Sequence, residues 1–189
     1  MTSSPGSGDL RTVRPLAEAD IDVLQAIDTR AHGQAWSQRT FLDELDQANR
    51  VHIVAEATGE IVGHAAAWTN AVSGRITNVA VAPEHAGHGH ATALLLELID
   101  QLVNERQVAN LQLEVRPANR RAQRLYSRFG FVPVGIERSF YDRSDERGST
   151  DALVMAVADV CAEPWRQRLG DVQTSHRQVE KERNAGASA

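Results

Sequence analysis

The sequence predicts an α/β fold in which a central mixed, mostly antiparallel sheet is flanked by helices. Segments with the period of two that is typical of strands alternate with segments in which apolar residues recur every three or four positions. Their predicted order is β-α-α-β-β-β-α-β-α-β-β, so that some strands follow one another directly and others are separated by helices. A chain of 189 residues fits one domain with a sizeable hydrophobic core.

Turn and capping residues set the bounds of the elements in the first half. Residues 1–10 are small and polar and are predicted to be disordered. Ser37 is expected to cap a helix, Thr58-Gly59-Glu60 to turn a hairpin, and Pro83 to end a strand. The predicted elements are strands at 11–15, 51–57, 61–69 and 75–82, and helices at 17–30 and from Ser37 onward.

The second half continues the same alternation. A long helix is predicted at 88–106 and a pair of strands at 131–141 and 152–157. We expect the folded domain to cover residues 11–158. The polar C-terminal extension, 159–189, carries scattered charges and is expected to be flexible, with a docking helix as the alternative.

The segment from Leu111 to Phe131 is the most informative about function. Leu111, Leu113 and Val115 alternate with polar residues, so Glu114 should point away from the core, toward solvent or a cleft. Asn119 is a good cap for the helix that follows. On that helix Tyr126 shares its face with apolar residues. The segment therefore brings one carboxylate and one phenol to neighbouring elements.

The spacing E-V-R-x-x-N-x-x-A-x-x-L-Y-x-x-x-G-F, from Glu114 to Phe131, resembles the GNAT acetyltransferases, and the resemblance covers roughly residues 11–158. It is similar above all to the branch that acetylates the N-terminal alanine of a small-subunit ribosomal protein. The resemblance implies the GNAT acyltransferase fold, acetyl-CoA as co-substrate and no metal. It also implies that Glu114 is the general base and Tyr126 the general acid.

A second segment, Val79 to Leu95, leads from a strand through a glycine-containing turn into a helix. Helix N-termini favour anions, and Gly87 and Gly89 let the backbone approach a diphosphate closely. The family's coenzyme A motif, Q/R-x-x-G-x-G/A, is matched except at its first position, where Ala86 stands; His85 or His88 could replace the missing charge. The cofactor-binding residues implied are Val79, Ala80, Val81, Ala86, Gly87, His88, Gly89, His90, Ala91 and Asn119.

Three further residues are candidates for binding the acceptor. Trp36 begins a segment that resembles the wall of the peptide site in this branch, although Ala35 replaces the usual proline. Asn78 matches the family pattern and could hydrogen-bond an incoming peptide backbone. Tyr141 resembles the second of two tyrosines, the first being Phe140 here.

Composition excludes several other classes. The net charge of −5 argues against nucleic acid as a direct ligand, and no apolar run reaches the ~20 residues of a membrane span. A lone Cys161 and the absence of a secretory signal favour the cytoplasm. His85, His88 and His90 lack a cysteine nearby to complete a zinc site, and His32, His52, His64 and His176 are expected to be structural.

The function predicted is Nα-acetylation of the N-terminal alanine of a basic ribosomal protein, which would be the protein's partner. Two alternatives remain at this stage. One is a GNAT enzyme that acetylates a small amine or a protein lysine, since one fold hosts many acceptors. The other is a non-catalytic acetyl-CoA-binding module, suggested by the substitution at Ala86. Nothing in the sequence specifies an oligomeric state.

Overall fold

The computed structural model describes residues 12–141 and 150–187. The predicted disorder of residues 1–10 lies outside this part of the chain. In the described residues no helix is long and apolar enough to cross a membrane.

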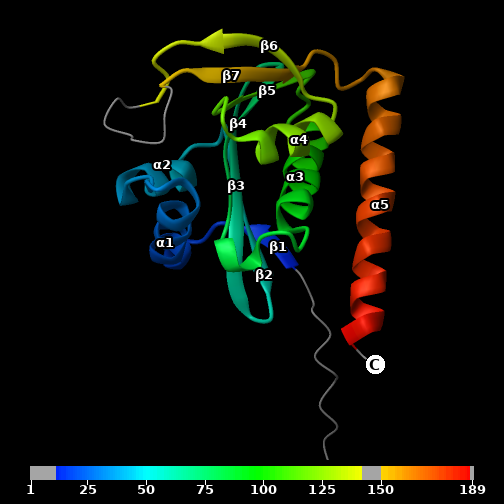
Figure 1. Ribbon diagram of the computed structural model, residues 1–189. Helices are drawn as coiled ribbons and strands as arrows, with labels where there is room; N and C mark the ends of the chain where they lie inside the picture. The colour runs from blue at the N-terminus through cyan, green and yellow to red at the C-terminus, as the bar shows by residue number, and fades with distance from the viewer. Residues whose placement is uncertain (1–11, 142–149, 188–189) are drawn as a thin grey trace, which may run out of the picture.

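A seven-stranded sheet forms the centre of the molecule, with the strands in the order β1-β2-β3-β4-β5-β7-β6 (Figure 1). Only β4 and β5 pair in parallel, and every other neighbouring pair is antiparallel, which confirms the predicted sheet. The strands are β1 (Thr12–Pro15), β2 (Arg50–Ala57), β3 (Glu60–Asn70), β4 (Ser73–Val81), β5 (Asn110–Val115), β6 (Val132–Glu137) and β7 (Ala152–Val157).

Helices cover both faces of this sheet. They are α1 (Ile21–His32), α2 (Gln38–Asp46), α3 (His90–Asp100), α4 (Arg120–Arg128) and α5 (Glu163–Ala187). Short 3-10 turns precede α1 and α3, and α3 continues into a π-helical turn, Gln101–Glu105. Two predicted caps are confirmed, because Ser37 Oγ accepts from the Thr40 amide at 3.1 Å and Asn119 Oδ1 accepts from the Ala122 amide at 3.0 Å.

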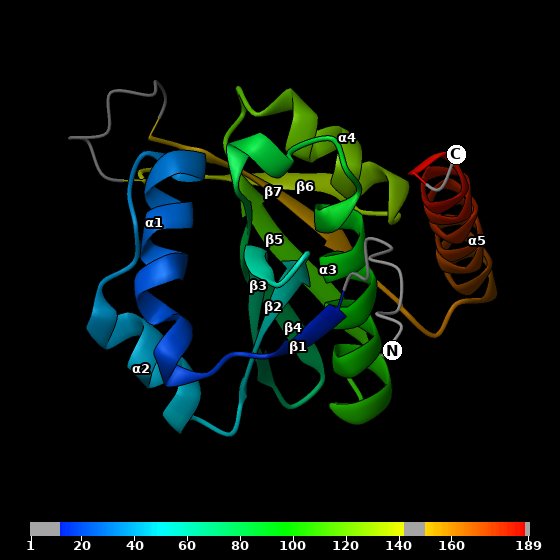
Figure 2. The same ribbon diagram turned by 90° about the horizontal axis from the view of Figure 1, so that it is seen from below.

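The hydrophobic core has two parts, one on each face of the sheet. Figure 2 shows the helices that cover these two faces. Alternation along each strand divides its side chains between them. On β2, Val51, Ile53 and Ala55 face the larger core under α3, whereas Val54 faces the smaller core under α1 and α2. This alternation also sends His52 toward α1 and α2, where its ring lies 5.7 Å from that of Phe41.

The sheet opens between its two parallel strands. The β4–β5 ladder runs from Ser73 opposite Asn110 to Ile76 opposite Leu113 and ends there. At the same point β4 carries a bulge, because Ala66 and Ala67 of β3 pair with Asn78 and Ile76 and leave Thr77 as the extra residue. A bulge bends its strand and re-aims the side chains that follow. The second half of β4 therefore diverges from the end of β5, where Glu114 lies.

The expectation of a flexible C-terminal extension is wrong, and the alternative of a docking helix is correct. α5 packs beside α3 and α4 with Trp165, Val172 and His176 buried. Trp165 Nε1 donates a hydrogen bond of 2.8 Å to the carbonyl of Phe129 at the end of α4. Apolar residues spaced along one face of this helix supply enough contact to order an otherwise polar segment.

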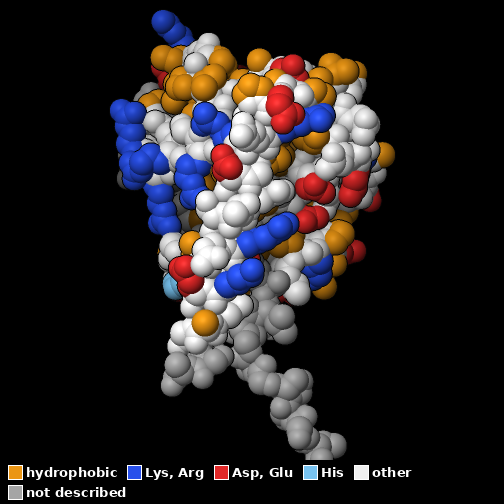
Figure 3. Space-filling model, turned by 90° about the vertical axis from the view of Figure 1, so that its right-hand side faces the viewer, with side chains coloured by type: hydrophobic (Ala, Val, Ile, Leu, Met, Phe, Trp, Pro, Cys, Tyr) orange, Lys and Arg blue, Asp and Glu red, His pale blue; other side chains and the backbone are white. Residues whose placement is uncertain are grey.

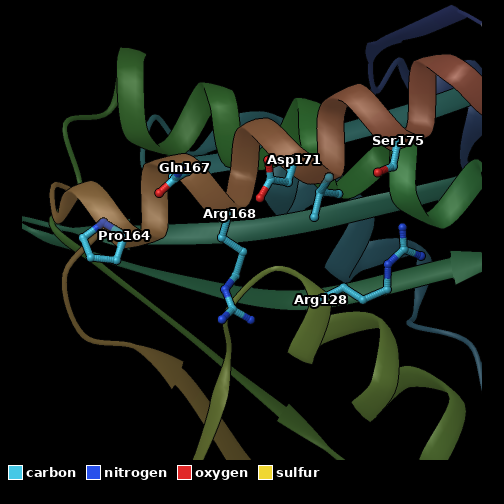
Figure 4. A pocket seen from close by; sticks show the side chains of 7 residues that line it. Arg128, Pro164, Gln167, Arg168, Asp171 and Ser175 are labelled. Atoms are coloured by element: carbon cyan, nitrogen blue, oxygen red, sulfur yellow. The ribbon is translucent and has the colours of Figure 1, made fainter.

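A shallow hollow of about 410 Å³ remains between α4 and α5. Arg128 enters it from α4, and Arg168 and Asp171 project into it from α5 (Figure 4). Arg and Lys side chains gather along this side of the molecule, as the space-filling view shows (Figure 3). The hollow holds neither Glu114 nor Tyr126, so the predicted chemistry lies elsewhere.

Candidate functional site

A cleft of about 770 Å³ opens where β4 and β5 diverge, bounded on its sides by α1 and α4. It is lined by both predicted catalytic residues, Glu114 and Tyr126, and by all three predicted acceptor-binding residues, Trp36, Asn78 and Tyr141. Val79 and Asn119 of the predicted cofactor set line it as well. Residues from five separate parts of the chain thus meet in one place.

Glu114 is held in a fixed direction by two neighbours. Its Oε2 accepts from Arg75 Nε at 2.8 Å, and its Oε1 accepts from Gln112 Nε2 at 2.8 Å. The Glu114 side chain is only 3% exposed, although it stands on the polar side of β5. A carboxylate has about four lone-pair positions, so each oxygen keeps one for a further donor in the cleft.

Tyr126 lies on the other side of the cleft, on α4. Its side chain is 8% exposed and packs edge-on against Phe131, with ring centroids 6.1 Å apart. Burial, and then the negative charge that Tyr141 would carry, raise the pKa of the Tyr126 phenol above its ordinary value. The phenol therefore stays protonated at neutral pH and can act only as a proton donor there.

The aromatic residues of the acceptor side are fixed by packing. The Trp36 carbonyl accepts from Gln25 Nε2 at 3.0 Å, and its ring lies 5.7 Å from that of Phe41. The guanidinium of Arg116 stacks over the ring of Tyr141 at 3.7 Å. Such a cation–π contact fixes the Tyr141 ring in the wall of the cleft.

A buried polar cluster stands behind this wall. Asp28 of α1 is 1% exposed, and it accepts from Asn78 Nδ2 at 3.0 and 3.2 Å and contacts His64 Nε2 at 3.0 Å. His32 Nε2 lies 3.1 Å from Asn78 Oδ1. Burial alone would raise the pKa of the Asp28 carboxyl, but the hydrogen bonds and charge of His64 and the bond from Asn78 lower it below its ordinary value.

The cluster continues away from the cleft through a second histidine. His52 Nε2 lies 3.0 Å from His64 Nδ1, and the two rings stack at 5.2 Å. Burial, with a smaller contribution from His64, lowers the pKa of His52 to about 3, so this ring is neutral. His32, His52 and His64 are distant in sequence and had been expected to be separate structural residues, but they join one network.

The predicted pyrophosphate loop has the backbone that its glycines suggest. Gly87 and Gly89 have φ of 84° and 85°, a left-handed conformation that disfavours other residues. Gly89 is the N-cap of α3, and no side chain caps that end. Arg183 of α5 donates to the carbonyl of His88 and ties the helix to this loop. The loop residues 86–91 are not among those lining the cleft, and neither are Ala80 and Val81.

These features fit the coenzyme A moiety of an acyl donor. The uncapped first turn of α3 offers amide N–H groups to a diphosphate, and a side chain at Gly87 would meet only open space. From there the diverging strands lead toward Glu114 and Tyr126. Within residues 12–141 and 150–187, no group of three or more His, Cys, Asp or Glu side chains is arranged to hold a metal ion.

Sequence reasoning missed Asp28, Arg75 and Gln112. Asp28 follows Leu24 and Ile27 on the buried stripe of α1, so a polar residue at a core position was the available signal. Arg75 precedes the bulge of β4, and Gln112 shares the polar face of β5 with Glu114, two residues away. Neither strand pattern alone could show that these side chains converge on one carboxylate.

Comparison with known proteins gives consistent matches. The model of the acetyltransferase (GNAT) family matches residues 21–131. The [ribosomal protein bS18]-alanine N-acetyltransferase of Escherichia coli is 34% identical over 149 residues, 78% of this chain and 97% of the relative. The enzyme of the same name from Salmonella typhimurium is 34% identical over 150 residues, 78% of this chain and 97% of the relative.

The solved structures agree with the sequence relatives. The crystal structure of the ribosomal-protein-S18-alanine N-acetyltransferase from Escherichia coli superposes with a TM-score of 0.71 at 31% identity, covering 82% of this chain and 97% of that one. The family model ends at residue 131, before β6, β7 and α5.

Proposed function

This chain belongs to the GNAT acetyltransferase family and is an acetyl-CoA-dependent N-acetyltransferase, and on that premise we propose that it acetylates the N-terminal alanine of a small-subunit ribosomal protein, with Glu114 as base and Tyr126 as acid. The observation that carries this proposal is the presence of both side chains in one cleft, at the point where the parallel strands separate. Similarity to enzymes named for that acceptor supports the choice of substrate.

The chemistry asks for a neutral amine. An α-amine, with a pKa near 7.7–8.0, is about one-tenth neutral at pH 7, whereas lysine, near 10.4, is neutral only a few times in ten thousand. A carboxylate base in the cleft therefore suffices for an N-terminus, and Glu114 keeps acceptor positions for the proton that the amine loses.

Acetyl-CoA supplies an activated thioester, and its acetyl group forms the new amide bond as the carbon–sulfur bond breaks. Negative charge that develops on the thioester oxygen would be stabilised by backbone N–H groups of Val79 to Val81, beyond the bulge where β4 leaves β5. The departing thiolate takes the phenolic proton of Tyr126, which its buried position keeps in place until then. The proton removed by Glu114 balances the one that Tyr126 gives up.

The acceptor would enter the cleft past Trp36, Asn78 and Tyr141. A peptide that reaches Glu114 from this side would contact these three residues, whereas the loop residues 86–91 do not line the cleft. The two substrates can therefore be bound together, and no covalent enzyme intermediate is needed.

Initial rates with acetyl-CoA test the acceptor. We expect a basic peptide that begins with alanine to be acetylated at its α-amine. Its kcat/KM should be at least tenfold above that of every polyamine in a panel, and at least tenfold above that of a lysine-rich peptide whose N-terminus is blocked. A preference for the panel or for lysine would overturn the proposed acceptor. Tight binding of acetyl-CoA with slow thiol release for every amine would instead indicate a binding module.

A further inference from the structure

Asp28 is a buried carboxylate that the mechanism above does not use. It accepts hydrogen bonds from Asn78 and from the Trp36 amide, the latter at 3.5 Å, and it contacts His64 at 3.0 Å. The ion pairs that it makes in the described part of the chain are with histidines, at 3.0 Å to His64 and 4.0 Å to His32. Burying a charge is costly unless it is well bonded or serves a ligand. Asp28 nevertheless lines the cleft.

Asp28 determines the orientation of Asn78. An ionised carboxylate only accepts hydrogen bonds, so the amide nitrogen of Asn78 must face it, as the contacts of 3.0 and 3.2 Å require. The amide oxygen of Asn78 then points the other way, toward His32 at 3.1 Å. The side of Asn78 that is turned from Asp28 is therefore a hydrogen-bond acceptor.

The histidines extend this arrangement into the core. His64 donates from Nε2 to Asp28, and in the neutral tautomer of His64 its Nδ1 accepts from His52 Nε2, an assignment made from these contacts. His52 is neutral because its pKa is lowered to about 3. His32 Nε2, at 3.1 Å, occupies one lone pair of the Asn78 oxygen, and an amide oxygen has a second lone pair for a donor that enters the cleft.

We propose that Asp28, Asn78 and His32 form a subsite for the cationic amine of the acceptor. In it, the oxygen of Asn78 accepts a hydrogen bond from the ammonium group, and the buried charge of Asp28 attracts that group through Asn78. The inference rests on the proposed transfer of acetyl to an amine, and it adds the feature by which the cleft selects a charged nitrogen. Asp28 is thus a positioning residue, because it acts through Asn78.

The subsite should act on binding rather than on the chemical step. Attraction of the ammonium lowers the energy of the bound substrate, and the ammonium must release one proton to solvent before the neutral amine attacks and gives its second proton to Glu114. Removing the charge of Asp28 should therefore raise KM for the acceptor about tenfold or more without lowering kcat. A merely structural role would lower kcat, stability and both substrate affinities together.

The replacement Asp28→Asn removes the charge and keeps the shape. The amide oxygen can replace Oδ2 and accept from Asn78 and the Trp36 N–H, while the amide nitrogen replaces Oδ1 toward His64 and gives up the second hydrogen bond from Asn78. His64 and His52 can accept this change by switching tautomers, since His64 bonds Asp28 through Nε2 and His52 through Nδ1 and can exchange the donor and acceptor roles of its two nitrogens. Asp20→Asn is the matched control, because Asp20 is also buried, at 6% exposed, but is bound to Arg14 outside the cleft.

The test measures binding in the absence of chemistry. Calorimetric titrations, with coenzyme A present, compare an alanine-starting basic peptide with its desamino analogue, in which a propionyl group replaces alanine. We expect the native protein and Asp20→Asn to prefer the amine by about tenfold or more, and Asp28→Asn to bind the two ligands within about twofold. The affinity of all three proteins for acetyl-CoA should agree within about twofold.

Equal discrimination in the native protein and Asp28→Asn would overturn the subsite. A loss of acetyl-CoA affinity in Asp28→Asn alone would also overturn it, because the effect would then be structural. If the native protein binds acetyl-CoA but neither peptide, the proposal that the acceptor is a peptide is wrong, and the subsite for an amine has still to be tested. The same comparison is then made with a polyamine, for which an undiminished affinity in Asp28→Asn would overturn the subsite.

Discussion

At the scale of single residues, the site depends on how Glu114 is held. Arg75 Nε and Gln112 Nε2 each bond one of its oxygens at 2.8 Å, so the carboxylate cannot turn away from the cleft. Arg75 is itself placed by a second contact, 3.5 Å to Glu137 of β6, and its guanidinium lies 5.9 Å from the ring of Phe140. Residues of three strands, β4, β5 and β6, thus fix the orientation of the Glu114 side chain.

Replacing Glu114 by glutamine should reduce kcat by roughly 10²–10⁴, because the amide keeps the shape but cannot take a proton. Steady-state rates across pH 6–9 would measure the loss. Glu137→Gln is the matched control, since Glu137 also contacts Arg75 but is not among the cleft residues. Near-native turnover of Glu114→Gln at every pH would exclude Glu114 as the base.

Tyr126→Phe tests the proton donor. The phenylalanine ring retains the packing against Phe131, while the phenolic proton is lost. We expect kcat to fall by roughly 10²–10⁴, with the affinity for acetyl-CoA within about twofold of the native value. Single-turnover rates and calorimetric binding would measure the two quantities. An unfolded variant, seen by a lost unfolding transition, would show instead that the tyrosine serves the core.

At the scale of elements, α5 is joined to the domain through the turn after α4. Gly130 has φ of 88°, and a Cβ on it would lie 2.8 Å from Trp165 Cδ1. Trp165 therefore packs on a position that only glycine can fill, and its Nε1 donates to Phe129 O at 2.8 Å. The far end of the same helix reaches the coenzyme A loop through Arg183 and His88.

Trp165→Phe should lower the free energy of unfolding by about 1–3 kcal/mol, because it leaves the buried Phe129 carbonyl without its donor. Urea denaturation followed by circular dichroism would measure this change. Val179→Ala is a suitable control, since Val179 lies on the same helix but is 50% exposed. Equal stability of the Trp165 variant would mean that the hydrogen bond from Trp165 to Phe129 adds nothing to the stability of the fold.

The elements that were predicted well are those that local rules determine. Ser37 and Asn119 cap their helices, and the strand at 152–157 has the predicted bounds, because each depends on residues within a few positions. α5 was mistaken for a flexible extension because its charges conceal a stripe at Trp165, Leu169, Val172 and His176. That spacing of four, three and four residues was the available signal.

The cleft itself could be predicted only in part. Family spacing identified Glu114 and Tyr126, but the separation of β4 from β5 depends on a bulge and on where a ladder ends. Both are set by tertiary pairing rather than by any local pattern. The buried cluster depends on tertiary contacts in the same way, because Asp28 of α1 contacts His64 of β3, which lies 36 positions later in the sequence.

At the scale of the whole molecule, the net charge of −5 is a poor description of the surface. Exposed arginines follow one another along α4 and continue on α5, and Figure 3 shows Lys and Arg side chains on the side of the molecule that carries α5. They are Arg120, Arg121, Arg124 and Arg128 on α4, and Arg166 and Arg168 on α5. The net charge therefore does not determine which ligands each face attracts. At ordinary ionic strength, screening limits the electric field of a charged patch to a distance of about 8–10 Å.

The buried histidine network makes the stability of the whole fold depend on pH. His52 is surrounded by His64 and, more distantly, by Glu44, Asp28 and Asp20, and its pKa is lowered to about 3, against about 6.5 in an unfolded chain. The unfolded chain therefore binds the proton first as the pH falls below 6.5. The stability that neutral His52 contributes is full above that pH and is lost progressively on acidification.

We expect the free energy of unfolding to fall by about 1 kcal/mol between pH 6.5 and 5.5 through His52 alone. Burial raises the pKa of Glu44, which acts in the opposite direction at lower pH, so the measurement stays above pH 5.5. Urea midpoints of the native protein, His52→Gln and the exposed-site control His88→Gln would be compared. His52→Gln should lose most of this pH dependence and His88→Gln should keep it. The same slope in all three proteins would mean that His52 is protonated in the fold.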